Sequence, residues 1–290
     1  MLSSSPMSIH STELTVGRPR SGALRGIAES MKAVVKRRRL VWYLANSSLR
    51  SKGKESILGN AWLIIDPTLQ LLIYYLLVGV ILRRPEPAFP LFLFAAILPW
   101  RWFTQAVSSS TESVRKMGKV MQQIVFPQIV LPVSAISASL GSFAFGMIPL
   151  LALYLLYPDR LTAWIFALPA VMAVQLLWTL PIAIILSAVN VFYNDIGNLV
   201  KHFLRLAFYL SPALFSYDKL LKAAESYPIV VQILHLNPMA WVLIAYRDLL
   251  YYGRSPDWFG LTVVAASSLP FTLLALYIFN RLSPRFAKVL

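Results

Sequence analysis

The chain has 290 residues, of which 58% are hydrophobic and 13% are charged, and its formal net charge is +15. Because it contains no cysteine, disulfides, thiolate metal sites and cysteine nucleophiles are excluded. A helix that crosses a bilayer needs about 20 mostly apolar residues, and stretches of that kind occupy most of the chain. They predict an all-α membrane protein with six transmembrane helices, at 61–82, 89–107, 124–157, 162–193, 196–215 and 259–279.

The basic residues predict how the chain is oriented in the membrane. With six spans, most of the 27 Lys and Arg residues fall in segments 1–57, 108–125, 191–205 and 281–290, whereas the acidic residues show no such bias. Lys and Arg in short loops stay on the cytoplasmic side, so both termini are predicted to be cytoplasmic. This distribution accounts for the positive charge without a nucleic-acid partner.

The N-terminal region divides into two predicted parts before the transmembrane domain at 56–290. Residues 1–24 are rich in Ser, Pro, Gly and Arg without an apolar run, which predicts a disordered cytoplasmic tail. Residues 25–55 predict an amphipathic basic helix with Trp42 and Tyr43 at its middle. Such a helix is expected to lie in the inner membrane interface, beside anionic headgroups. The alternative is a solvated basic helix that only sets orientation.

The first span contains the pair Asp66-Pro67. Asp is a favoured N-cap and Pro a favoured first helical residue, so the spanning helix is predicted to begin near Pro67. Gln70, Tyr74 and Tyr75 would then project from it. The alternative is that Asp66 is a functional acid within the lipid.

The third and fourth stretches are too long for one simple crossing. Residues 124–157 would extend about 51 Å as a single helix, so a short inner element is expected before the true crossing. Prolines predict bends in both stretches. Between the fifth and sixth spans, Pro228–Leu236 and 239–252 are each too short to cross and are separated by Asn237-Pro238. They are predicted to be two short re-entrant or interfacial helices on the outer side.

The sequence contains few signals for catalysis. It has no G-x-x-x-x-G-K-[ST] loop for ATP phosphates, no G-x-S-x-G elbow and no H-E-x-x-H pair. His10, His202 and His235 lie far apart without a carboxylate cluster and are predicted to be bystanders. Aromatic rings are numerous near the spans instead. Most fit packing or interfacial belts, and the remainder could line a path for a solute with flat apolar faces, such as a sugar.

From about Arg50 onward, a series of short motifs resembles the integral membrane subunits of type-2 ABC exporters that move lipid-linked polysaccharides. The motifs, in chain order, are Ser56-Ile57-Leu58-Gly59, Ala61-Trp62 with Asp66-Pro67, Leu98-Pro99-Trp100 with Trp102-Phe103, Phe126-Pro127 with 129–132, Asn194-Asp195-Ile196, Leu210-Ser211-Pro212, and Leu236-Asn237-Pro238 with Ala245-Tyr246-Arg247. Arg101 departs from the family, which usually has a neutral polar residue or a hydrophobe there. An arginine at this point would face an aqueous path or an anionic substrate, or would snorkel to the inner surface.

The resemblance implies a multi-pass permease of the cell inner (plasma) membrane that pairs with a second copy of itself. It implies two copies of a separate ABC ATPase that binds ATP and Mg, with no cofactor or metal in this chain. The cargo would be a lipid-linked cell-surface polysaccharide such as capsule, O antigen of lipopolysaccharide or a teichoic-acid-like polymer. Membrane lipids and periplasmic export proteins are further expected partners.

Two other functions compete with this one. A polytopic enzyme acting on lipid-linked sugars would be expected to gather carboxylates or histidines at one membrane face, whereas the outer acids here are scattered. An ion-coupled carrier would need titratable residues near the midplane, where Asp66 and Arg101 are the candidates.

Two sets of residues are expected to serve the exporter. Ser109 to Glu112 has the spacing of a capping box, which predicts a short helix over 111–122 that couples to the ATPase; a plain basic loop is the alternative. Its contact residues would be Glu112, Val114, Met117, Val120 and Met121. The polymer path is expected along the dimer axis, between spans one and five of the two copies, with aromatic rings as its surface. Its lining would be Tyr74, Tyr75, Trp100, Arg101, Phe208 and Tyr209.

Overall fold

The computed structural model describes residues 23–51, 56–81, 87–124 and 126–290. The regular elements in these ranges are all helical, which confirms the all-α prediction. The α-helices are α1 Ala23–Lys36, α2 Arg38–Ser51, α3 Trp62–Tyr74, α4 Phe89–Lys116, α5 Gly118–Gln123, α6 Val130–Leu156, α7 Leu168–Phe192, α8 Ile196–Tyr209, α9 Tyr217–Ala224, α10 Pro228–Leu236, α11 Pro238–Arg247, α12 Trp258–Leu282 and α13 Phe286–Val289. The predicted tail at 1–22 and the end of the predicted amphipathic segment at 52–55 lie outside the described residues.

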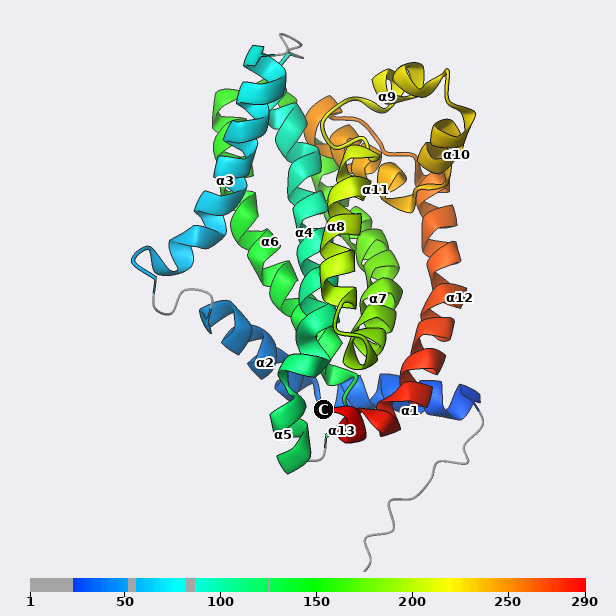
Figure 1. The fold of residues 1–290 in the computed structure, drawn as a ribbon. Helices are drawn as coiled ribbons and strands as arrows, with labels where there is room; N and C mark the ends of the chain where they lie inside the picture. Colours follow the sequence, from blue (N-terminus) through cyan, green and yellow to red (C-terminus); the bar gives the residue numbers. More distant parts are fainter. Residues whose placement is uncertain (1–22, 52–55, 82–86, 125) are drawn as a thin grey trace, which may run out of the picture.

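The long helices form one bundle (Figure 1). Helices α3, α4, α6, α7, α8 and α12 run lengthwise, with α1, α2, α5 and α13 at the end that Figure 1 shows below and α9 and α10 at the opposite end. These are called the lower end and the upper end. Helix α4 lies in the middle of the bundle and packs against α6, α7, α8 and α11. Its residues from Leu91 to Ile97 are buried on every side, as expected for a helix that is apolar all round.

Several segments are suited to a membrane crossing. Those that are long and apolar enough are Gly59–Ile81, Val130–Leu156, Ala163–Phe192 and Trp258–Arg285. Pro228–Leu236 and Pro238–Tyr252 are bent by 68° and count as a fifth candidate only if taken as one broken span. The stretch predicted at 196–215 is helical as α8, whose 14 residues extend roughly 21 Å. That is shorter than a hydrocarbon core of about 30 Å.

The predicted amphipathic segment forms two helices. The break between α1 and α2 falls at Arg37, within four consecutive basic residues, and like charges close together destabilise a helix. Both helices lie at the lower end, where α1 packs against α12 and α2 packs against α6. Trp42 and Tyr43 remain exposed on α2.

The prediction that Asp66 caps the first spanning helix is wrong. Helix α3 begins at Trp62 and contains both Asp66 and Pro67, and it continues as a π-helix over Tyr75–Ile81. The carboxylate of Asp66 contacts Arg101 on α4 instead of the backbone at a helix start. A capping rule considers only neighbours in sequence, so this partner could not be found from the motif itself.

A short element precedes the crossing helix in the fourth stretch, as predicted, whereas the short helix α5 ends at Gln123, before the third stretch begins. Helix α5 and an extended residue, Ile124, precede α6, and a 3-10 turn at Ala163–Ala167 precedes α7. Proline lies inside α6 and α7, at Pro149 and Pro181. At the upper end, the side chain of Asn237 accepts a hydrogen bond from Met239 N and thereby caps α11.

Candidate functional site

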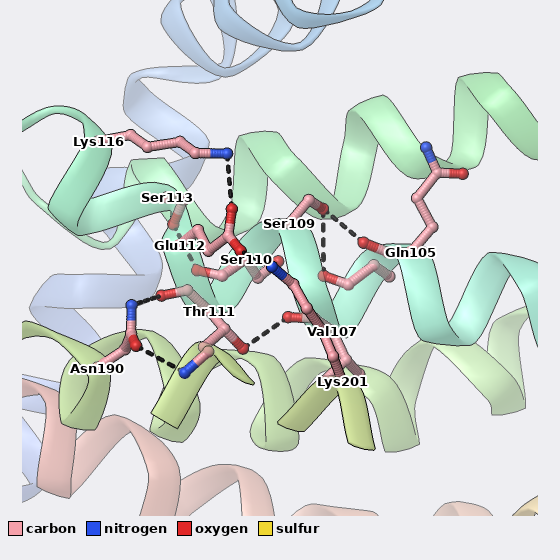
Figure 2. Close-up of polar contacts among 12 residues, drawn as sticks. Gln105, Val107, Ser109, Ser110, Thr111, Glu112, Ser113, Lys116, Asn190 and Lys201 are labelled. Carbon is pink, nitrogen blue, oxygen red and sulfur yellow. Dashed lines mark hydrogen bonds and ion pairs between the residues drawn. The ribbon is translucent and has the colours of Figure 1, made fainter. Parts of the chain in front are cut away.

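At the lower end, Asn190 joins three helices (Figure 2). Its Nδ2 donates to the carbonyl of Thr111 on α4 at 3.0 Å, and its Oδ1 accepts from Gly197 N on α8 at 3.0 Å. Asn190 itself belongs to α7, and both it and Thr111 are buried. The ends of α4, α7 and α8 are therefore held by one amide side chain.

The residues predicted as a capping box lie inside α4. The hydroxyl of Ser109 donates to Gln105 O at 2.6 Å, and that of Thr111 donates to Val107 O at 2.8 Å (Figure 2). These bonds are those of hydroxyls within a continuous helix. The helix breaks only at Met117, so the short separate helix is α5 and not the whole of 111–122.

The carboxylate of Glu112 is engaged within the chain. Its two oxygens contact Lys116 Nζ at 2.7 Å and Lys201 Nζ of α8 at 2.6 Å (Figure 2). The hydrogen bond from Lys116, which has the larger effect, and the one from Lys201 hold the pKa of Glu112 below its ordinary value. Beside it, Arg115 Nη1 donates to Asn194 Oδ1. Glu112 thus ties α4 to the start of α8 through charge-assisted bonds.

The apolar residues predicted to couple to an ATPase do not form one exposed face. Val114 is fully buried and Met121 is nearly so, and both pack against residues such as Ile129 and Phe286 in a core at the lower end. Met117 is half-buried, whereas Val120 is 39% exposed. The free surface of α5 comprises Lys119, Val120, Gln122 and Gln123.

In the middle of the bundle, four of the five predicted path rings meet. Phe208 of α8 lies 5.3 Å from Tyr74 of α3, 5.8 Å from Trp100 of α4 and 5.4 Å from Tyr209, measured between ring centroids. Phe208 and Trp100 are buried, while Tyr209 is 57% exposed. We call these four residues the ring cluster. Tyr75 lies outside it and contacts Phe89 at 6.2 Å.

A series of polar contacts runs from α4 through α3 to Tyr209 of α8. Arg101 contacts Asp66 Oδ2 at 3.2 Å and Gln70 Oε1 at 3.3 Å, both on α3. Asp66, Gln70 and Tyr74 share one face of α3 because they are spaced by four residues. The side chain of Tyr74 interacts in turn with Gln70 and Tyr209. Arg101 and Asp66 also line a hollow of about 350 Å³ with Asn60, Gln105 and Ser142.

At the upper end, buried Arg247 binds the backbone where α8 ends. Its guanidinium donates to the carbonyls of Phe92, Pro212, Ala213 and Phe215 and lies 3.9 Å from the ring centroid of Phe92. Three of these carbonyls belong to the irregular segment after α8 and the fourth to α4, so the buried side chain pairs backbone groups of a segment that has no helical hydrogen bonds of its own. This role was not predicted from the sequence, although Arg247 is one of few charges in an apolar stretch.

Known proteins that are similar to this chain belong to the family that its sequence motifs resemble. The ABC-2 type transporter family matches residues 39–251. The chain is 31% identical over 252 residues to the O-antigen export system permease protein RfbA of Myxococcus xanthus, a match that covers 87% of this chain and 95% of that protein. It is 27% identical over 253 residues to a protein of the same name from Klebsiella pneumoniae, with the same coverage. The chain belongs to the ABC-2 type transporter family.

Proposed function

We propose that this chain is the permease subunit of an ABC exporter that moves a lipid-linked cell-surface polysaccharide across the inner membrane. Membership of the ABC-2 type transporter family supports a transport role. The names of the relatives from Myxococcus xanthus and Klebsiella pneumoniae support a polysaccharide as the cargo. The structural observation that carries the proposal is the ring cluster, which presents Tyr209 at the surface of a single copy.

Aromatic rings suit a sliding polysaccharide for a physical reason. Their faces offer dispersion and weak C–H contacts to sugar rings without fixed hydrogen bonds, so no single register of the polymer is deeply trapped. The ring cluster draws on α3, α4 and α8, which are spans one, two and five of the proposed topology. A second copy placed against α3 and α8 would enclose the path.

The proposed topology has six spans: α3, α4, α6, α7, α8 and α12, with α10 and α11 as re-entrant helices outside. The start of α1 and the end of α13 are both at the lower end of the bundle (Figure 1), which supports a cytoplasmic location for both. Single cysteines introduced into this Cys-free chain can test it. Labelling of Asp195→Cys by an impermeant thiol reagent from outside the inner membrane, or failure to label Asp218→Cys from there, would contradict six spans.

Energy for transport would come from a separate ATPase that binds ATP and Mg, with two copies of it beneath two copies of this chain. The exposed surface of α5 is the proposed docking element, since it lies at the lower end and carries Val120 among polar residues. Membrane lipids would surround the complex, and periplasmic export proteins would receive the polymer.

The alternative enzyme is less well supported. Within the described residues, no three His, Cys, Asp or Glu side chains are grouped so that they could hold a metal ion. The two functions can be distinguished by deleting the gene and analysing the lipid-linked glycan in the lipid fraction of the cells. Loss of an exporter leaves completed lipid-linked glycan inside the cell and none at the surface. A truncated or missing lipid-linked glycan would show an enzyme and overturn the proposal.

A further inference from the structure

One face of α8 carries a polar stripe. Asn198, His202, Arg205 and Tyr209 are spaced by four, three and four residues, which places them on one side of a helix, and all four are exposed. We call these residues the α8 stripe. A different side of α8, with Leu199, Phe203 and Leu206, lines an apolar groove of about 860 Å³ next to α7 and Phe271 of α12. The stripe is therefore separate from the apolar side of this helix.

The position of Arg205 along α8 is deep. On the sequence alone it belongs to the inner segment 191–205, but it lies roughly 14 Å from the first residue of α8. The next turn contains Phe208, which contacts Trp100, and Trp100 is well inside the apolar part of α4. The charge of Arg205 thus lies one helical turn from the ring cluster.

Two other cations, one on α4 and one on α8, are balanced by carboxylates. Arg101 contacts Asp66, and Lys201 contacts Glu112. Arg205 forms no ion pair or hydrogen bond with any of the residues that the structure describes. An arginine at membrane depth is costly unless it faces water or an anion, so an unbalanced one indicates a functional site.

Three acids that a second copy of the chain would bring already have cationic partners. Within the predicted apolar stretches 61–82, 89–107, 124–157, 162–193, 196–215 and 259–279 the acidic residue is Asp66, and it already pairs with Arg101. Glu112 is shared by two lysines at the lower end, and Asp248 pairs with Arg254 at the upper end. Because these three acids already have cationic partners, we expect the counter-charge of Arg205 to come from outside the protein.

We propose that Arg205 binds the phosphate-bearing group that joins the polysaccharide to its lipid, as that group passes along the α8 stripe. This inference rests on the proposed export function. A guanidinium presents paired N–H donors that match two oxygens of a phosphate, and the hydroxyl of Tyr209 and the amide of Asn198 add hydrogen-bonding groups on the same face. The uncharged sugar units would then contact the ring cluster. Helix α8 would thus contact both the phosphate-bearing group and the polysaccharide.

The test uses the full chain purified in complex with its ATPase. The probes are a short-chain polyprenyl diphosphate carrying one sugar and the matching polyprenyl glycoside without phosphate, with binding followed by native mass spectrometry. Arg205→Gln should weaken binding of the diphosphate by about tenfold or more and leave binding of the uncharged glycoside unchanged. Arg205→Lys should fall between, because it keeps the charge but loses the paired donors. Arg285→Gln, at an exposed arginine of the lower end, is the control and should bind both probes normally.

Four other results of this experiment would contradict the inference, and each points to a different explanation. Equal affinity of Arg205→Gln and the unsubstituted chain for the diphosphate would show that Arg205 does not bind it, even where export continues. Displacement of the probe by phosphatidylglycerol but not phosphatidylcholine would assign the site to a phospholipid headgroup. Loss of the dimer in Arg205→Gln would assign it to subunit contact. If the unsubstituted complex binds neither probe and carries no glycan to the surface, the proposed function itself has failed.

Discussion

The guanidinium of Arg101 lies 3.2 Å from the carboxylate of Asp66, so two charges in neighbouring proposed spans neutralise each other. Removal of one partner leaves the other unpaired at membrane depth, which costs more than removal of both. Arg101→Gln and Asp66→Asn should each destabilise the purified protein by about 1–2 kcal/mol, because both side chains are partly exposed, and the double substitution should recover most of that loss. Thermal unfolding of the four proteins in detergent measures the cycle; strictly additive losses would mean that the pair is not coupled.

The contacts of Arg247 predict a larger loss of stability than those of the Arg101–Asp66 pair. Because it is only 3% exposed and binds four backbone carbonyls, Arg247→Met should destabilise the protein by about 3–5 kcal/mol and reduce its level in the membrane. Arg247→Lys should fail to rescue it, since one ammonium cannot replace the planar fork of donors. The matched control is Arg254→Lys, at a largely exposed arginine that pairs with Asp248. A normal melting temperature for Arg247→Lys would show that the carbonyl contacts are dispensable.

These two arginines also show how far the sequence could predict the structure. The apolar stretches could be anticipated because apolar length is visible in sequence, whereas the packing of Tyr74, Trp100 and Phe208 against one another depends on contacts between helices far apart in the chain. The partner of Asp66 is 35 residues away and those of Arg247 are 32 to 155 residues away, so local rules could not find either. The same limit explains Glu112, which fits a capping pattern but bonds to Lys201 across the bundle.

Glu112 predicts a dependence of stability on pH. Its pKa in the folded protein is lowered by Lys116 and Lys201, so its contribution is present above its ordinary value of 4.5 and is lost as the pH falls through the lowered folded pKa. The thermal midpoint of the unsubstituted chain should therefore exceed that of Glu112→Gln at pH 7, and the two should converge in acid below pH 4.5. Parallel curves across this range would show that the carboxylate does not tie α4 to α8.

The surface of α5 predicts where the ATPase docks. Val120→Asp places a charge on an exposed side chain of α5 and should abolish co-purification of the ATPase while the permease stays folded. Met121→Asp buries a charge in the core of the lower end and should instead prevent folding. Val289→Asp, at an exposed valine of α13, is the control for an acidic charge at the same end. Full ATPase binding and hydrolysis in Val120→Asp would place the docking site elsewhere.

The most direct test of the proposed path is a crosslink between the protein and its cargo during export. A photoreactive phenylalanine analogue replaces either Tyr209, in the ring cluster, or Phe166, an exposed ring before α7. In cells that contain the ATPase, illumination should attach glycan to the chain through position 209, and the attachment should disappear when the ATPase is inactivated. Position 166 should capture no glycan. Glycan captured at 166 and absent at 209 would contradict a path along α3 and α8.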